Sequence, residues 1–188
     1  MQKSISYKVI RSNRKTVALQ VKDGNVIVRA PYLMSDPDIQ KFVEKNSDWV
    51  MKSLKKEEDR KEKLKDIEPL SMEDIQKLAD KALKVIPERV AYYAPKVGVT
   101  YGGITIRNQK TRWGSCSSKG NLNFNCLLML TPPEVIDSVV VHELCHRKEM
   151  NHSKRFYDEV LRVYPEYKKW DKWLKDNGGL IMERMLKA

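Results

Sequence analysis

The chain has 188 residues, 41% of them hydrophobic and 32% charged, so it can bury the core of one ordinary domain with a small appendage. No apolar stretch is longer than residues 126–130, well short of the ~20 residues that span a bilayer, and the N-terminus has no apolar signal region. We therefore expect neither membrane insertion nor secretion. Three widely spaced cysteines without a CxxC pair favour a reducing, cytoplasmic location, and the net charge of +11 leaves a nucleotide or nucleic-acid partner open.

The first third of the chain is predicted to form a small β-rich lobe followed by a helix. Ser35 or Asp36 is the expected N-cap of that helix, whose apolar residues continue to Leu54 and lead into a charged stretch at residues 52–66. We place a boundary there, between an N-terminal lobe (residues 1–66) and a main domain (residues 67–188). The expected strands are Tyr7–Ile10, Val17–Val21 and Val26–Val28, with a hairpin turn at residues 23–25.

The main domain groups a few short strands between helices, and we expect an α+β fold. Ser71 and Asp74 resemble a capping box, and Pro87 is expected to kink or end the helix that they begin. Strands are expected at residues 104–107, 111–116 and 121–126, the last two joined by a turn ending at Gly120. A helix capped by Thr131 should follow and run to residue 150, and residues 178–179 (Gly-Gly) should interrupt the last helix.

The strongest chemical signal is the sequence His142-Glu143-Leu144-Cys145-His146, an HExxH pattern. On a helix, histidines four residues apart differ by only ~40° in direction and ~6 Å in rise, so both imidazoles can bind one ion. Glu143 points to the neighbouring side, where it can act as the general base on a zinc-bound water.

The third of the protein's three histidines, His152, is the expected third ligand of a single zinc ion per chain. It lies six residues after His146, so the helix must end between them. We expect Asn151 to adopt a left-handed conformation at that end and Ser153 to cap the next helix. A carboxylate of that helix, Asp158 or Glu159, is the alternative third ligand.

These residues, from Val139 to His146 and then Asn151, His152, Ser153 and Phe156, resemble the YgjP-like zinc metallopeptidases, which are related to the WLM and SprT-like families. The upstream segments at residues 111–116 and 121–123 match the same pattern. The resemblance is specific over residues 110–157. It implies a minimal zincin fold: a small antiparallel sheet, an active-site helix and supporting helices.

The expected function is a zinc metallohydrolase, most simply one that cleaves peptide bonds in a peptide or protein substrate. Arg112, Asn123 and Asn125 are candidate substrate-binding residues, because zincins commonly bind an extended substrate along a strand that precedes the active-site helix. Two alternatives remain open. One is a nucleoside triphosphate pyrophosphatase acting, for example, on UTP. The other is a DNA-associated protease of the SprT or WLM type, bound to DNA by electrostatics.

Overall fold

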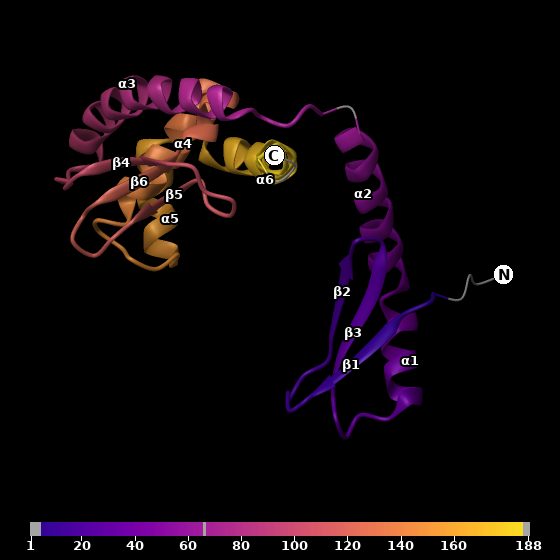
Figure 1. Ribbon diagram of the computed structural model, residues 1–188. Helices are drawn as coiled ribbons and strands as arrows, with labels where there is room; N and C mark the ends of the chain where they lie inside the picture. Colours follow the sequence, from indigo (N-terminus) through magenta and orange to yellow (C-terminus); the bar gives the residue numbers. More distant parts are fainter. Residues whose placement is uncertain (1–4, 66, 186–188) are drawn as a thin grey trace. The chain divides into compact units, whose positions relative to one another are not determined.

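The computed structural model describes residues 5–65 and 67–185 (Figure 1). The chain divides into two compact units, residues 1–67 and residues 68–188. The fold class is α+β, as expected from the sequence. Within the described residues no helix is both long and apolar enough to cross a membrane.

The first unit is a three-stranded sheet with two helices. The central strand β3 pairs in parallel with β1 and antiparallel with β2, giving the order β1-β3-β2. Asp23 and Gly24 form the β2–β3 turn with positive φ angles of 54° and 82°, as a tight hairpin requires. Its elements are β1 (Lys8–Ser12), β2 (Ala18–Lys22), β3 (Asn25–Pro31), α1 (Asp36–Lys45) and α2 (Ser47–Lys65).

The helical part of this unit begins where the sequence predicts but is divided in two. Ser35 caps α1 by accepting a hydrogen bond from the backbone N–H of Asp38. The expected continuous helix is interrupted at Asn46, whose side-chain amide donates to the carbonyl of Phe42 at 2.7 Å. Asparagine competes in this way with the helical backbone, so α1 ends there and α2 begins at Ser47.

The second unit places one buried helix, α4, among three other helices and a small sheet (Figure 1). Helix α4 packs against α3, α5, α6 and β5, so it is apolar on nearly all sides. The elements of this unit are α3 (Met72–Val97), β4 (Ile104–Arg107), β5 (Gly114–Cys116), β6 (Leu122–Asn125), a 3₁₀ helix η1 (Cys126–Leu130), α4 (Pro133–Cys145), α5 (Lys154–Val163) and α6 (Tyr167–Glu183).

The sheet of the second unit is mixed rather than purely antiparallel. Its order is β4-β6-β5, with β4 parallel and β5 antiparallel to β6. Gly120 has a φ of 86° in the turn between β5 and β6, as the sequence predicts. Strand β6 buries Leu122 and Phe124 and ends at Asn125, where the 3₁₀ helix takes over.

Expectations for three helices of this unit are wrong. Helix α3 has the predicted capping box of Ser71 and Asp74, but it continues through Pro87 to Val97. The buried face of α3 around Pro87 packs on α4, and this tertiary burial outweighs the ~3 kcal/mol that an internal proline costs. Helix α4 begins one residue later than expected, because the Thr131 hydroxyl donates to the Leu128 carbonyl instead of capping it.

The wrong expectation for the third of these helices concerns its two glycines. Helix α6 is continuous across Gly178 and Gly179. Gly178 is buried against the indole of Trp113, and a Cβ there would lie 2.9 Å from the indole Cζ2. The glycine therefore permits close packing and does not break the helix.

Candidate metal centre and active site

Helix α4 presents the HExxH residues near its C-terminal end. His142 and Glu143 lie in its last turn, and His146 is its C-cap. Because the helix is packed by neighbours on every side, its backbone provides a rigid base for these side chains.

The chain then turns back so that His152 reaches the same place. Helix α4 ends at Cys145 with His146 as its C-cap, so the expected end at residue 150 is wrong. Ser153 caps α5 by accepting from the N–H of Phe156, as predicted. The prediction for Asn151 is wrong. Among the described non-glycine residues, only Asp23 has a positive φ, so the reversal is spread over several ordinary turn residues.

Two interactions, rather than a residue in the left-handed conformation, stabilise this turn. The carbonyl of Glu149 faces Nδ1 of His146 at 3.0 Å. Lys148 forms an ion pair with Glu159 of α5 at 2.5 Å, which ties the turn to the following helix. The geometry that the metal site needs is therefore supplied by side chains on both sides of the turn.

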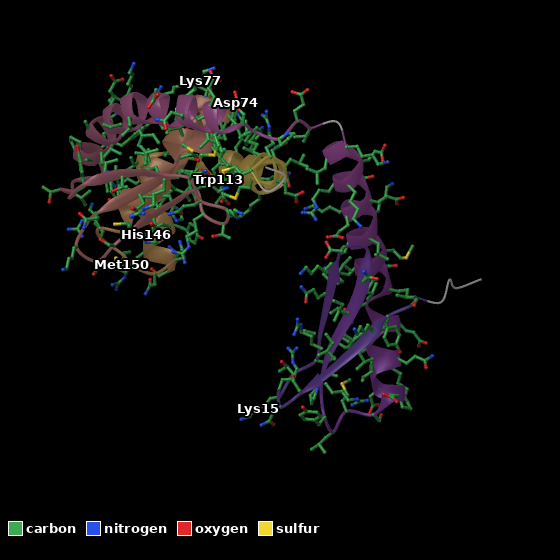
Figure 2. All side chains as sticks on the ribbon, in the orientation of Figure 1. Lys15, Asp74, Lys77, Trp113, His146 and Met150 are labelled. Atoms are coloured by element: carbon green, nitrogen blue, oxygen red, sulfur yellow. The ribbon has the colours of Figure 1, made fainter. Side chains whose placement is uncertain are left out.

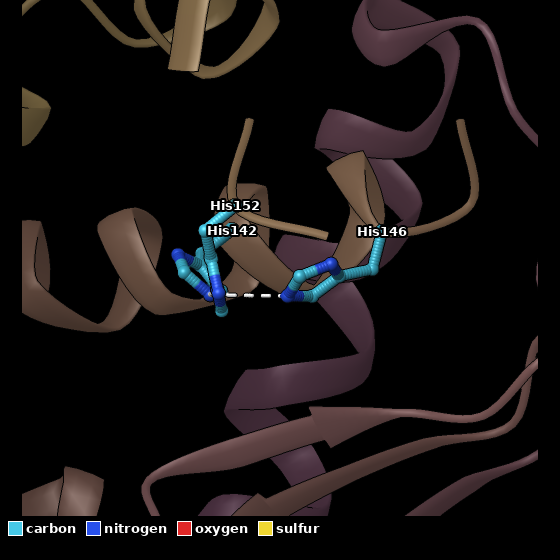
Figure 3. A group of neighbouring side chains, drawn as sticks. All are labelled: His142, His146 and His152. Atoms are coloured by element: carbon cyan, nitrogen blue, oxygen red, sulfur yellow. Dashed lines mark hydrogen bonds between the residues drawn. The ribbon is translucent and has the colours of Figure 1, made fainter. Parts of the chain in front are cut away.

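The three imidazoles converge through their Nε2 atoms (Figure 3). Nε2 of His142 lies 3.2 Å from Nε2 of His146 and 3.0 Å from Nε2 of His152. Three nitrogens bound tetrahedrally to zinc at ~2.0–2.1 Å would be about 3.3 Å apart. The spacing fits a single small cation, with the three histidines as its ligands.

The hydrogen bonds of the outer ring nitrogens support the same conclusion. A carbonyl only accepts, so the contact with Glu149 requires the neutral His146 ring to carry its proton on Nδ1 and a lone pair on Nε2. Nδ1 of His142 lies 2.8 Å from the hydroxyl of Tyr167, whose oxygen can accept a hydrogen bond from that nitrogen in the same way. Two lone pairs that face each other repel unless a cation lies between them. Outer partners of this kind typically orient metal-binding histidines.

The electrostatics keep the imidazoles in the neutral form that a metal needs. Burial, reinforced by His146 and His152, lowers the pKa of His142 to about 3. Burial also lowers the pKa of His146. Protons therefore compete weakly for these two ligands near neutral pH.

Glu143 is buried beside this cluster with an exposed fraction of 6%. Within the described part of the chain no hydrogen bond reaches its carboxylate. Burial raises the pKa of Glu143 to about 8, opposed by the charge of Arg112. A cation held by the neighbouring histidines would favour the ionised carboxylate and lower that pKa again.

Glu143 also rests directly on the backbone of β5. A Cβ at Gly114 would lie 2.6 Å from Oε1 of Glu143 and 2.9 Å from its Cδ. Real Cβ atoms essentially never approach that closely, so the glycine makes the space in which the carboxylate lies. Neither Gly114 nor Tyr167 was singled out from the sequence. The spacing of residues along the chain gives no signal for the contact between Gly114 on β5 and Glu143 on α4. It also gives none for the contact between His142 and Tyr167, which are 25 residues apart.

The alternative third ligands are engaged elsewhere. Asp158 pairs with Lys154 at 2.7 Å, and Glu159 pairs with Lys148 and Arg162. Neither carboxylate belongs to the ligand cluster in the described residues. His152 is the ligand that the geometry supports.

The candidate substrate residues differ in their availability. Arg112 is exposed, lines a cavity next to Glu143, and forms no ion pair or side-chain hydrogen bond among the described residues. Asn123 is half-buried; it accepts from Arg107 and donates to Ser115. Asn125 is 1% exposed and donates to the carbonyls of residues 109 and 112. That burial leaves Asn125 no surface for a substrate, and its amide instead holds the segment before β5.

Cys116 on β5 does not have the environment of a nucleophile. Burial, followed by the nearby Glu143 carboxylate, raises the pKa of its thiol. Its Sγ donates to the carbonyl of Ser117 at 3.4 Å. The protonated thiol is a structural side chain.

Comparison with known proteins agrees with this geometry. The profile of the YgjP-like metallopeptidase domain matches residues 15–76 and 70–177, which is most of the chain. The chain belongs to the YgjP-like metallopeptidase family. As a YgjP-like protein it is a metallohydrolase, and the family resemblance inferred from the HExxH segment is confirmed. A search of curated proteins finds no significant match.

Two solved structures are similar to part of this YgjP-like chain, and both are metallopeptidase zymogens. Abylysin of Pyrococcus abyssi is 23% identical, with a TM-score of 0.44, and the match covers 48% of this chain and 93% of abylysin. Jannalysin of Methanocaldococcus jannaschii is 24% identical, also with a TM-score of 0.44, and the match covers 50% of this chain and 97% of jannalysin.

Proposed function

We propose that the protein is a zinc-dependent peptidase in which His142, His146 and His152 hold one zinc ion per chain. The observation that carries the proposal is the convergence of three Nε2 atoms, of which that of His146 presents a lone pair fixed by the Glu149 carbonyl. Three neutral imidazoles are a ligand set typical of catalytic zinc, with a fourth position free for water or substrate.

Zinc, when bound, would polarise the carbonyl of the scissile bond and make a water molecule more acidic. The protein's own contribution begins with Glu143. Its carboxylate has no internal hydrogen bond within the described residues, so it is free to take a proton from the attacking water. It then gives that proton to the nitrogen of the departing amine. One buried carboxylate serves both steps because it stays within the same water-poor space.

The substrate would be an extended peptide lying along β5. This strand pairs with β6 on one side, and its other edge has no strand partner in the described residues. Because β5 packs against α4, a peptide added to that edge would pass beside Glu143. Arg112, which lies just before β5 and is exposed, would bind carbonyl or carboxylate oxygens of the peptide. Asn123 is a weaker candidate, since its amide is already hydrogen-bonded.

Neither alternative function is favoured. The family match concerns a metallopeptidase domain, and no feature of the site is specific for a nucleotide or for DNA. Peptide hydrolysis is therefore the function that we propose.

The test is Glu143→Gln, measured in zinc-loaded protein on a mixed peptide library. Glutamine keeps the shape of the side chain but cannot take the proton. We expect unchanged zinc content and a rate lowered by ~10²-fold or more, because general-base catalysis typically contributes that much. Near-normal cleavage by this variant would exclude Glu143 as the base. His152→Ala should bind zinc more weakly, and equal binding would exclude that ligand.

A further inference from the structure

A cavity of about 270 Å³ adjoins the catalytic residues. It begins at His142 and Glu143 and extends between the segment before β5, helix α4 and helix α6. Its other lining residues are Thr111, Arg112, Trp113, Gly114, Ser138, Val139, Tyr167, Asp171 and Leu174.

Two charged groups of the lining, Glu143 and the exposed Arg112, have no side-chain hydrogen bond among the described residues. Three other polar groups of the cavity have partners. The Ser138 hydroxyl donates to the Val135 carbonyl at 2.8 Å, and Asp171 is paired with Lys175 at 2.5 Å. The Tyr167 hydroxyl is hydrogen-bonded to His142. Apart from Arg112 and from Glu143, which the proposed reaction uses, the cavity therefore offers a charged side chain no free charged partner in exchange for its lost hydration.

The remaining wall is apolar. It consists of the indole of Trp113 and the side chains of Val139 and Leu174. Ligand sites usually measure ~300–1,000 Å³, so this volume suits one side chain better than a whole small molecule. An apolar side chain placed there would leave water and contact these three residues.

We propose that this cavity is a specificity pocket, which binds a bulky apolar side chain, of the size of leucine, methionine or phenylalanine, from a residue next to the scissile bond. The proposal rests on the proposed peptidase function, because the cavity is a substrate site only if the adjoining His142 and Glu143 belong to a peptidase active site. It adds the substrate class: peptides with such a residue at the cleavage site.

Trp113, which is labelled in Figure 2, forms one wall of the pocket. Gly178 sets the position of its indole. A Cβ at Gly178 would lie 2.9 Å from Cζ2 and 3.2 Å from Nε1 of the indole. Alanine there must displace the ring and reshape the wall. The next residue, Gly179, has no atom within 4 Å of its would-be Cβ, so Gly179→Ala is a matched control in the same helix.

The experiment measures binding of small hydroxamates to the zinc-loaded protein. Hydroxamates chelate the metal, so their side chains report on the adjoining pocket without requiring turnover. We expect leucine and phenylalanine hydroxamates to bind at least ~10-fold more tightly than acetohydroxamate. Gly178→Ala should reduce that advantage by ~3-fold or more, whereas Gly179→Ala should retain it.

The outcomes separate this proposal from the proposed function. If acetohydroxamate binds but leucine hydroxamate binds no better, or lysine or glutamate hydroxamates bind best, the apolar pocket is refuted and the metal site stands. If Gly178→Ala behaves like Gly179→Ala, Trp113 does not form the wall and the assignment falls. If no hydroxamate binds to protein that holds one zinc, both the metal-centred function and the pocket are refuted.

Discussion

The substitution Gly114→Ala tests whether β5 positions the catalytic base. The added Cβ would lie 2.6 Å from Oε1 of Glu143, and ordinary contact begins at 3.4 Å. The carboxylate must therefore move by about 0.8 Å, the difference between these two distances. A displacement of ~1 Å at a reacting group can lower a rate by ~10²-fold. We expect a fall of that order in kcat, with zinc affinity and KM within about threefold of wild type.

The matched control is Gly103→Ala. A Cβ at Gly103 would lie 3.7 Å from its nearest neighbour, Oδ1 of Asn121, which is ordinary contact. This variant should therefore keep wild-type turnover. The assay is steady-state peptide hydrolysis of zinc-loaded proteins, with circular dichroism and metal analysis as folding and loading controls. Wild-type kcat in folded, zinc-loaded Gly114→Ala would refute the reasoning.

Two further predictions concern the support of the metal site. Tyr167→Phe removes the hydroxyl that is hydrogen-bonded to Nδ1 of His142, so zinc affinity should fall by ~10–100-fold. The affinity is measured by competition with a chromophoric chelator, and wild-type affinity would show that the contact does not orient the ligand. Glu159→Gln removes a carboxylate whose pKa is lowered to about 2, first by the hydrogen bond from Arg162 and then by Lys148. Because the pKa is lowered on folding, its stabilisation is present above ~4.5 and lost as the pH falls towards ~2. Allowing for the exposure of both cations, the variant should lose about 1–2 kcal/mol of unfolding free energy at pH 7 and progressively less below pH 4.5 in urea titrations; a loss that does not change with pH would contradict this origin.

The metal ligands could be predicted from sequence because their geometry is local. His142 and His146 meet on one helix whatever surrounds it, and His152 is close enough along the chain that only a turn is needed. How that turn is made could not be predicted. Asn151 has the residue type of a left-handed cap, but the contact of His146 with the Glu149 carbonyl and the ion pair of Lys148 with Glu159 stabilise the turn instead.

The errors in the fold have the same physical origin. Pro87, Gly178 and Gly179 are helix breakers by intrinsic preference, yet each lies inside a continuous helix. At Pro87 burial of the helix face overrides local preference, and at Gly178 the missing side chain admits the indole of Trp113. The role of Gly114 is likewise tertiary, since a strand and a helix meet there. The N-terminal hairpin was predictable because its turn residues and alternating strands are local signals.

The most direct test of the account is peptide cleavage as a function of metal content. Protein stripped with a chelator, reloaded to one zinc per chain and incubated with a mixed peptide library would be analysed by mass spectrometry. The account predicts no cleavage by the stripped protein, recovery on reloading, and cleavage beside bulky apolar residues. Folded protein that holds one zinc at His142, His146 and His152 and cleaves no peptide in the library would contradict it.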